Sequence, residues 1–186
     1  MRKYAYIFID IDGVLNNAHT KGIKQGFCWL DDDNIAVFAL FLKCCHTKYG
    51  EANVKIILSS SWRSNCFPGK SDCMSSFLQE RLEKENIKID DETEFLDDWS
   101  RGTEIAEYLL RHRDSVEHFV VIDDVLWEDF KPLGITGHWV QTADDPRNGR
   151  GGLRRRHIKA LNAAMDRTVT EKTFAKLERS KVFRIS

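Results

Sequence analysis

Three short apolar runs, each ending abruptly in polar residues, constrain the fold of this chain more than any other feature. The runs are rich in β-branched and aromatic residues, and they cover Tyr4–Ile9, Val54–Leu58 and Phe119–Ile122. Runs of this length that are apolar throughout predict strands buried on both faces. Such strands need covering layers on both sides, which the intervening segments would have to supply.

Segments with helical spacing of apolar residues separate these runs. They cover 31–48, 72–85 and the stretch that follows Ser100, which is a suitable N-cap residue. Strands that alternate with helices predict a parallel sheet with crossover connections on both of its faces. We therefore expect an α/β fold, a three-layer Rossmann-like sandwich with a central, mainly parallel sheet.

The last third of the sequence adds three further expectations. Residues 138–141 are predicted to form an edge strand, 153–165 a helix, and about 168–181 a second, amphipathic helix packed on the domain. The chain contains no internal repeat or Pro/Gly/Ser-rich linker, so we expect one domain over residues 1–186.

Composition excludes several classes of protein. The formal charge of −1 and the pI near 6.6 exclude a globally basic nucleic-acid binder, although they leave room for a local basic patch. No apolar run approaches the roughly 20 residues that cross a bilayer, so no membrane association is expected. The five cysteines lack a repeated C-x-x-C spacing, which favours reduced thiols and a cytoplasmic location.

Polar side chains at the predicted strand ends form a candidate site. Asp10 and Asp12 follow the first strand, Ser59 follows the second and Asp123 follows the third. The carboxyl ends of parallel strands share one edge of the sheet, so these side chains should converge. Clustered carboxylates repel one another unless a cation compensates them, and their hard oxygens suit Mg²⁺. Backbone amides around Gly13 would help to hold a phosphate beside Asp10, the candidate nucleophile.

Three segments of the sequence resemble the ordered motifs of the haloacid dehalogenase (HAD) superfamily. They read IFIDIDGVLN, VKIILSSSWR and VVIDD. Together with RGTEI and the later GGL, they are similar to a small-cap subgroup that includes the HAD domains of RNA-repair proteins. The resemblance extends from Tyr4 to about Leu161 and implies a HAD-like fold with a minimal cap.

The resemblance also implies a role for each strand-end residue. Asp10 would be the nucleophile and a metal ligand, and Asp12 would bind the metal through its main-chain carbonyl and serve as general acid and base. Ser59 would hydrogen-bond the transferring phosphoryl group. Asp123 and Asp124 would complete the Mg²⁺ site.

The superfamily further implies a basic residue that neutralises the phosphoryl oxygens. Arg101 is the first candidate because it opens the helix that leads into the third strand, and Arg81 and Lys84 are weaker ones. Trp62 is equally compatible with a place in the pocket wall and with a place in the core. The candidates for contact with the substrate are Gly13, Ser60, Trp62 and Arg63.

These features predict a Mg²⁺-dependent phosphohydrolase that cleaves phosphomonoesters through an aspartyl-phosphate intermediate. Asp12 favours phosphoryl transfer over dehalogenation, because phosphatases of the superfamily use this aspartate to protonate the leaving group. Only about 46 residues separate Asp12 from Ser59, which leaves little room for a cap. An open site suits a bulky or macromolecular phosphoester. The expected substrate is a phosphorylated small molecule or a nucleic-acid end, with nucleotides and nucleic-acid ends as the more specific version.

Two other functions remain open from the sequence, a catalytically silent phosphate-binding regulatory module and a metal-dependent nuclease. The sequence identifies no protein partner. An arginine-rich segment either contacts substrate phosphates away from the reacting one or forms a solvated surface. Its arginines are Arg147, Arg150, Arg154, Arg155 and Arg156.

Overall fold

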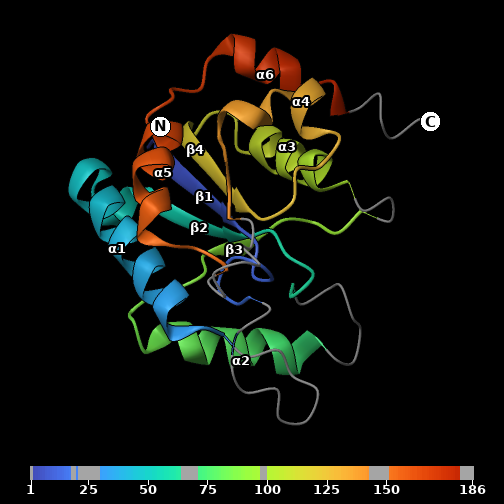
Figure 1. Cartoon of the computed structure of the whole chain (residues 1–186). Helices are drawn as coiled ribbons and strands as arrows, with labels where there is room; N and C mark the ends of the chain where they lie inside the picture. Colours follow the sequence, from blue (N-terminus) through green and yellow to red (C-terminus); the bar gives the residue numbers. More distant parts are fainter. Residues whose placement is uncertain are drawn as a thin grey trace.

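The computed structural model contains one sheet with helices on both of its faces (Figure 1). It describes residues 2–17, 20, 30–63, 71–96, 100–142 and 151–180, with the side chains of residues 71–76 left out. The strands are β1 (Tyr4–Ile9), β2 (Val54–Leu58), β3 (Asp91–Glu92), β4 (Val116–Asp123) and β5 (Trp139–Gln141). The helices are α1 (Asp32–Tyr49), α2 (Ser71–Glu83), α3 (Arg101–Arg111), α4 (Phe130–Leu133), α5 (Ile158–Met165) and α6 (Glu171–Leu177).

All strand pairs of this sheet are parallel, and the strand order is β3-β2-β1-β4-β5. In the central register, Ile7 of β1 lies between Ile56 of β2 and Val120 of β4. The chain moves outward from β1 through β2 to β3, and then returns to the other side of β1 with β4. This reversal creates a topological switch point between β1 and β4, the place where open α/β sheets bind ligands.

The two faces of the sheet carry separate hydrophobic cores. Neighbouring residues of β1 point to opposite faces, so Ile7 packs under α1 and α5 whereas Phe8 packs under α3, α4 and α6 (Figure 1). Both side chains are fully buried. The structure therefore confirms the three-layer α/β fold expected from the sequence.

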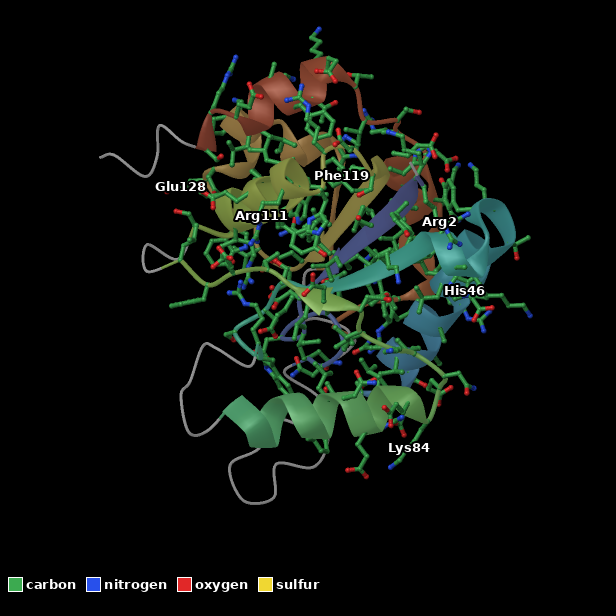
Figure 2. The ribbon with its side chains drawn as sticks, turned by 180° about the vertical axis from the view of Figure 1, so that it is seen from behind. Arg2, His46, Lys84, Arg111, Phe119 and Glu128 are labelled. Carbon is green, nitrogen blue, oxygen red and sulfur yellow. The ribbon has the colours of Figure 1, made fainter. Side chains whose placement is uncertain are left out.

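Helix α2 has a different place from the layer helices. In both Figure 1 and Figure 2 it lies beyond the carboxyl ends of the strands, and its buried residues Leu78 and Leu82 join the core on the α1 side. In the described residues between β1 and β2, α1 is the only α-helix. The minimal cap expected from the spacing of Asp12 and Ser59 stays a prediction, because residues 18–19 and 21–29 lie outside the described residues.

The structure differs from the sequence expectations mainly at the edges of the sheet. Strand β3 has only two residues, both acidic, so it carries no apolar run that could have predicted it. Strand β4 begins earlier and ends later than the predicted Phe119–Ile122. Edge strand β5 begins after His138, whose ring stacks on Phe119 with 3.9 Å between the ring centroids.

The two C-terminal helices are shorter than their apolar spacing indicated. Residues Arg155–His157 form a 3-10 turn, and α5 itself begins only at Ile158. Helix α6 covers Glu171–Leu177 within the expected 168–181, and it packs on the side of α3 and α4 through Phe174 and Leu177. None of the described helices is both long and apolar enough to span a bilayer.

A fully buried asparagine in α1 fixes the segment that follows β5. The Asn34 Nδ2 donates to the carbonyl oxygens of Gly151 (3.3 Å) and Leu153 (2.8 Å). Leu153 N in turn donates to the Val14 carbonyl oxygen at 2.8 Å. Gly152 has φ +72° there, and a Cβ on it would lie 2.4 Å from Asn34 Oδ1, so the contact requires glycine. Asn34 thus joins α1, the segment 151–153 and the loop after β1.

Replacing Asn34 with alanine should lower the free energy of unfolding by about 3 kcal/mol, because two buried carbonyl groups lose their donor. Chemical denaturation followed by circular dichroism measures this loss. Leu40→Ala on the same helix is the control, since Leu40 is 37% exposed and its truncation should cost less than about 0.5 kcal/mol. Equal losses in the two variants would contradict the proposed anchoring.

Candidate active site

The loop after β1 is a tight turn built around the Ile11 carbonyl oxygen. The three residues after Gly13 all direct their backbone N–H groups to this oxygen, at 2.9 to 3.3 Å. Gly13 has φ +70°, and a Cβ on it would lie 2.2 Å from Asp124 Oδ2. Asp124, just after β4, therefore packs directly against the turn, and only glycine fits at position 13. The switch point between β1 and β4 thus brings two distant loops together.

Three carboxylates meet at this switch point. One oxygen from each of Asp10, Asp123 and Asp124 lies within 4.8 Å of the others. Asp10 is 9% exposed and Asp123 only 1% exposed. Burial raises the pKa of Asp10 to about 6. Burial, together with the neighbouring charge of Asp10, raises the pKa of Asp123 to about 8.

The raised pKa values show that burial, with the charge of neighbouring carboxylates, makes the ionised forms of Asp10 and Asp123 costly. A divalent cation would remove this cost, and three carboxylate oxygens in reach of one another are the hard donors that Mg²⁺ prefers. The residues therefore fit a Mg²⁺ ion held by Asp10, Asp123 and Asp124. The side chain of Asp12 lies outside this group, so a contact from Asp12 would have to come from its main chain.

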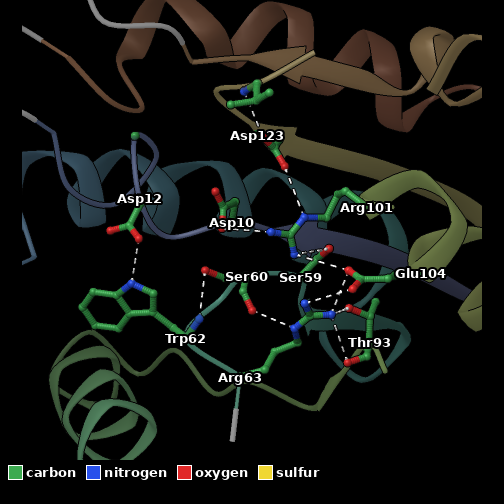
Figure 3. Close-up of polar contacts among 12 residues, drawn as sticks. Asp10, Asp12, Ser59, Ser60, Trp62, Arg63, Thr93, Arg101, Glu104 and Asp123 are labelled. Carbon is green, nitrogen blue, oxygen red and sulfur yellow. Dashed lines mark hydrogen bonds and ion pairs between the residues drawn. The ribbon is translucent and has the colours of Figure 1, made fainter. Parts of the chain in front are cut away.

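Arg101, the first residue of α3, lies between these carboxylates and Ser59 (Figure 3). Its Nη1 lies 3.4 Å from Ser59 Oγ, its Nη2 4.0 Å from Asp10 Oδ1 and its Nε 3.8 Å from Asp123 Oδ2. The side chain is buried, and its Nε has no hydrogen-bond acceptor among the described residues. The guanidinium therefore compensates the carboxylates and still has donor capacity for a ligand.

The two weaker candidates for the basic position lie elsewhere. Arg81 is on α2 and pairs with Asp32 at the start of α1. Lys84 is exposed just after α2, as Figure 2 shows. Of the three basic candidates from the sequence, the structure thus brings only Arg101 to the carboxylates.

The serines after β2 lie beside Asp10. Ser59 N donates to the Ile9 carbonyl oxygen at 2.9 Å, which continues the pairing of β2 with β1 past the end of the strands. The Ser59 side chain is buried and faces Arg101. A hydrogen bond from the Ser60 side chain opposes part of the rise in the pKa of Asp10. Both serines are therefore placed where a group bound at Asp10 would lie.

Asp12 is held at the exposed rim of the site by two N–H donors. Asn16 Nδ2 donates to Asp12 Oδ1 at 2.8 Å, and Trp62 Nε1 donates to Asp12 Oδ2 at 3.0 Å. Trp62 is itself 2% exposed and belongs to the core on the α1 side. Figure 3 shows the Asp12 carboxylate turned toward Trp62 rather than toward Asp10. Trp62 therefore has both of the places that the sequence allowed: its ring packs in the core, and its N–H reaches Asp12 at the site.

Arg63 was a candidate for substrate contact from the sequence, but its side chain is buried with 2% exposure. Its guanidinium pairs with Glu104 of α3, at 2.9 Å between Nη1 and Oε2. Sequence reasoning did not select Glu104, which had the appearance of an ordinary first-turn acidic residue. The only available signal was its place in the RGTEI string, next to Arg101.

Sequence reasoning also missed Trp127. Its Nε1 donates to Asp123 Oδ2 at 3.2 Å, and its ring lies 5.5 Å from Arg101 Cζ. A tryptophan four residues after a strand end carries no motif, so only the fold could reveal this contact with two site residues. Trp127 limits the movement of both Asp123 and Arg101.

Part of the arginine-rich segment lies close to the loop after β1. Arg147 and Arg150 lie outside the described residues. Arg154 Nε donates to the Gly151 carbonyl oxygen at 2.9 Å, and its Nη1 lies 3.8 Å from Asp33. The two arginines that follow it are exposed, and they come directly after the segment that Leu153 fixes to Val14.

The acidic site should make Mg²⁺ binding and stability depend on pH in opposite directions. The folded pKa values of Asp10 and Asp123, about 6 and about 8, lie above the ordinary value of 3.8. Their contribution to stability is therefore present below about pH 4 and is lost as the pH rises through 6 and 8. Mg²⁺ binds the ionised carboxylates, so its stabilising effect should grow over the same range. Both trends can be measured by thermal melting at pH 5.5 and pH 8.5, without Mg²⁺ and with Mg²⁺ at about ten times its Kd. This concentration is on the order of millimolar.

Asp123→Asn provides the control for this experiment. The variant lacks the group with the higher pKa, so its stability without metal should fall less between the two pH values, and Mg²⁺ should stabilise it weakly at both. A Mg²⁺-induced shift in melting temperature that is equal at the two pH values in the unmodified chain would contradict the assignment.

Comparison with known proteins adds family membership to this geometry. The family model described as the HAD domain in Swiss Army Knife RNA repair proteins matches residues 6–149. No curated protein and no solved structure gives a match. The matched region contains the acidic group, both serines and Arg101. The chain therefore belongs to the HAD domain family of Swiss Army Knife RNA repair proteins.

Proposed function

We propose that the chain is a Mg²⁺-dependent phosphohydrolase that cleaves phosphomonoesters through an aspartyl phosphate on Asp10. The observation that carries this proposal is the buried Arg101, whose Nε lacks an acceptor among the described residues although it lies beside two carboxylates. An oxygen of a phosphoryl group bound beside Asp10 would accept this hydrogen bond.

The first half of the reaction forms the covalent intermediate. A carboxylate oxygen of Asp10 attacks phosphorus as the bond to the leaving oxygen breaks, and Asp12 gives a proton to that oxygen. Arg101 and Ser59 donate hydrogen bonds to the phosphoryl oxygens, where charge develops. Mg²⁺ held by the three carboxylates would supply positive charge that lets a phosphate dianion approach Asp10.

The second half regenerates the enzyme. Asp12, now ionised, takes a proton from a water molecule whose oxygen attacks the phosphorus. The bond between phosphorus and Asp10 breaks, and inorganic phosphate leaves with Asp12 protonated again. The exposed position of Asp12, fixed by Asn16 and Trp62, supports this role because both the leaving group and the water must arrive from solvent.

For the substrate we propose a nucleotide or a phosphorylated nucleic-acid end. The description of the family as a domain of RNA repair proteins supports this substrate class. A second support is that Arg155 and Arg156 are exposed next to the segment anchored on Val14, where they can attract further phosphate groups.

Asp10→Asn should lower the turnover of p-nitrophenyl phosphate by at least about a thousandfold, because a neutral amide cannot replace the carboxylate as nucleophile. Steady-state assays with Mg²⁺ measure this, followed by assays with 5′- and 3′-phosphorylated oligonucleotides. Asp114→Asn, in the exposed connection between α3 and β4, is the matched control and should retain full activity.

The same assays test the other functions. Retained turnover in Asp10→Asn would reject Asp10 as nucleophile. Binding of phosphate without turnover of any phosphoester would identify a silent binding module. Cleavage of oligonucleotides that lack terminal phosphates would identify a nuclease.

Trp62→Phe should impair catalysis selectively according to the leaving group. The variant keeps the aromatic ring in the core but removes the N–H that fixes Asp12, so proton transfer to the leaving oxygen becomes less efficient. We expect kcat to fall by about tenfold for a nucleoside monophosphate, whose alkoxide must be protonated as it leaves. For p-nitrophenyl phosphate, whose leaving group needs little protonation, kcat should change less than about threefold. An equal loss on both substrates would refute this role for Trp62.

A further inference from the structure

We propose that Arg63 and Glu104 form a positioning pair that holds Arg101 in the orientation in which it meets the phosphoryl group. The inference rests on the proposed phosphohydrolase function and assigns to Arg63 a role other than substrate contact. The network joins two places in the fold, since Arg63 follows β2 whereas Arg101 and Glu104 both lie in the first turn of α3. Figure 3 shows them in one continuous network.

Arg63 is fixed by contacts to protein on every donor nitrogen. Its Nη1 and Nη2 bind the two carboxylate oxygens of Glu104 at 2.9 and 3.2 Å, a two-point pairing. Its Nε donates to the Ser60 carbonyl oxygen at 2.7 Å. Its Nη1 also donates to Thr93 Oγ1 at 2.6 Å and to the Glu94 carbonyl oxygen at 3.0 Å. Arg63 thus joins the serine segment, β3 and α3 from behind the site.

Glu104 is shared between two arginines. Besides its pairing with Arg63, its Oε2 lies 3.6 Å from Arg101 Nη1, one turn earlier on α3. Leu96 N donates to its Oε1 at 3.2 Å. The carboxylate is 3% exposed, so water does not screen its attraction for either cation. Its position is set by Arg63, and the position of Arg101 depends on it.

On the side of the site, Arg101 makes one long hydrogen bond and two long ion pairs. Its nitrogen atoms lie 3.4 Å from Ser59, 4.0 Å from Asp10 and 3.8 Å from Asp123. An arginine side chain has many rotamers, and ordering it requires firm contacts. Glu104 adds an ion pair at 3.6 Å from behind, and the ring of Trp127 lies beside the guanidinium. Because Glu104 is itself fixed by Arg63 at 2.9 and 3.2 Å, it gives Arg101 a charged partner with a defined position.

The charges of these three residues predict what happens to Arg101 when the pairing of Arg63 with Glu104 is lost. Without the pairing of Arg63, Arg101 would become the main counter-ion of Glu104 and would move back toward it, away from Asp10. Lysine at position 63 keeps the positive charge but cannot make the two-point contact or reach the same carbonyl groups. Glu104→Gln keeps the shape of the side chain but removes the charge that both arginines share.

The test is a double-mutant cycle between Arg63→Lys and Arg101→Ala, assayed with p-nitrophenyl phosphate at saturating Mg²⁺. In the unmodified background, Arg63→Lys should lower kcat by about tenfold with less than about threefold change in KM. In the Arg101→Ala background, the same change should lower kcat by less than about twofold, because the group through which it acts is gone. Glu104→Gln should follow the same pattern.

A stability control separates positioning from general damage to α3. Leu109→Ala truncates a fully buried residue of the same helix that packs in the core away from Arg101. It should lower the melting temperature at least as much as Arg63→Lys. At a temperature where both variants are folded, its kcat should stay within about twofold of the unmodified chain.

Each outcome decides the inference. An undiminished effect of Arg63→Lys in the Arg101→Ala background would overturn it, as would a loss of kcat no greater than that of Leu109→Ala. If the unmodified chain turns over no phosphoester, the proposed function fails, and the cycle is then measured on the affinity for inorganic phosphate. Coupling of Arg63 to Arg101 in that affinity would support the positioning role, and its absence would overturn it.

Discussion

The burial of two carboxylates at the ends of adjacent strands is the constraint to which the rest of the site responds. The parallel register of β1 and β4 places Asp10 and Asp123 side by side, and burial then raises the pKa of each. Arg101 compensates part of this charge, at 4.0 and 3.8 Å from them. The remaining excess of negative charge makes the site suited to a divalent cation rather than to a further basic side chain.

A second consequence of this constraint is that the network of charged side chains extends from the site into the interior of the protein. A cation placed beside two buried carboxylates must itself be held, and α3 supplies Glu104 for this purpose from its own first turn. Glu104 then needs a partner, which Arg63 provides from the segment after β2. Charges therefore alternate in sign from the switch point into the interior, and each is stabilised by neighbours of opposite charge.

The sequence predicts the frame of this site better than its interior. The apolar runs locate β1 and β2 with their observed bounds and the central part of β4. The rule that ligands gather at the carboxyl ends of parallel strands brings Asp10, Ser59 and Asp123 together. The residues in the interior of the site could not be predicted from the sequence, for physical reasons. Buried arginines are rare, so Arg63 after a strand end favours a reading as an exposed, ligand-contacting residue. Strand β3 escaped because two acidic residues pair through their backbone alone.

The contact between Leu153 and Val14 shows that the homologous stretch and the folding unit have different limits. The family match ends at residue 149, yet Val14 in the loop after Asp10 accepts a backbone hydrogen bond from Leu153, which lies beyond the match. Leu161 and Met165 of α5 complete one core, and Phe174 and Leu177 of α6 complete the other. A chain cut at the end of the match would keep Asp10, Asp123 and Asp124 but would lose the hydrogen bond to Val14 and the helices that complete both cores.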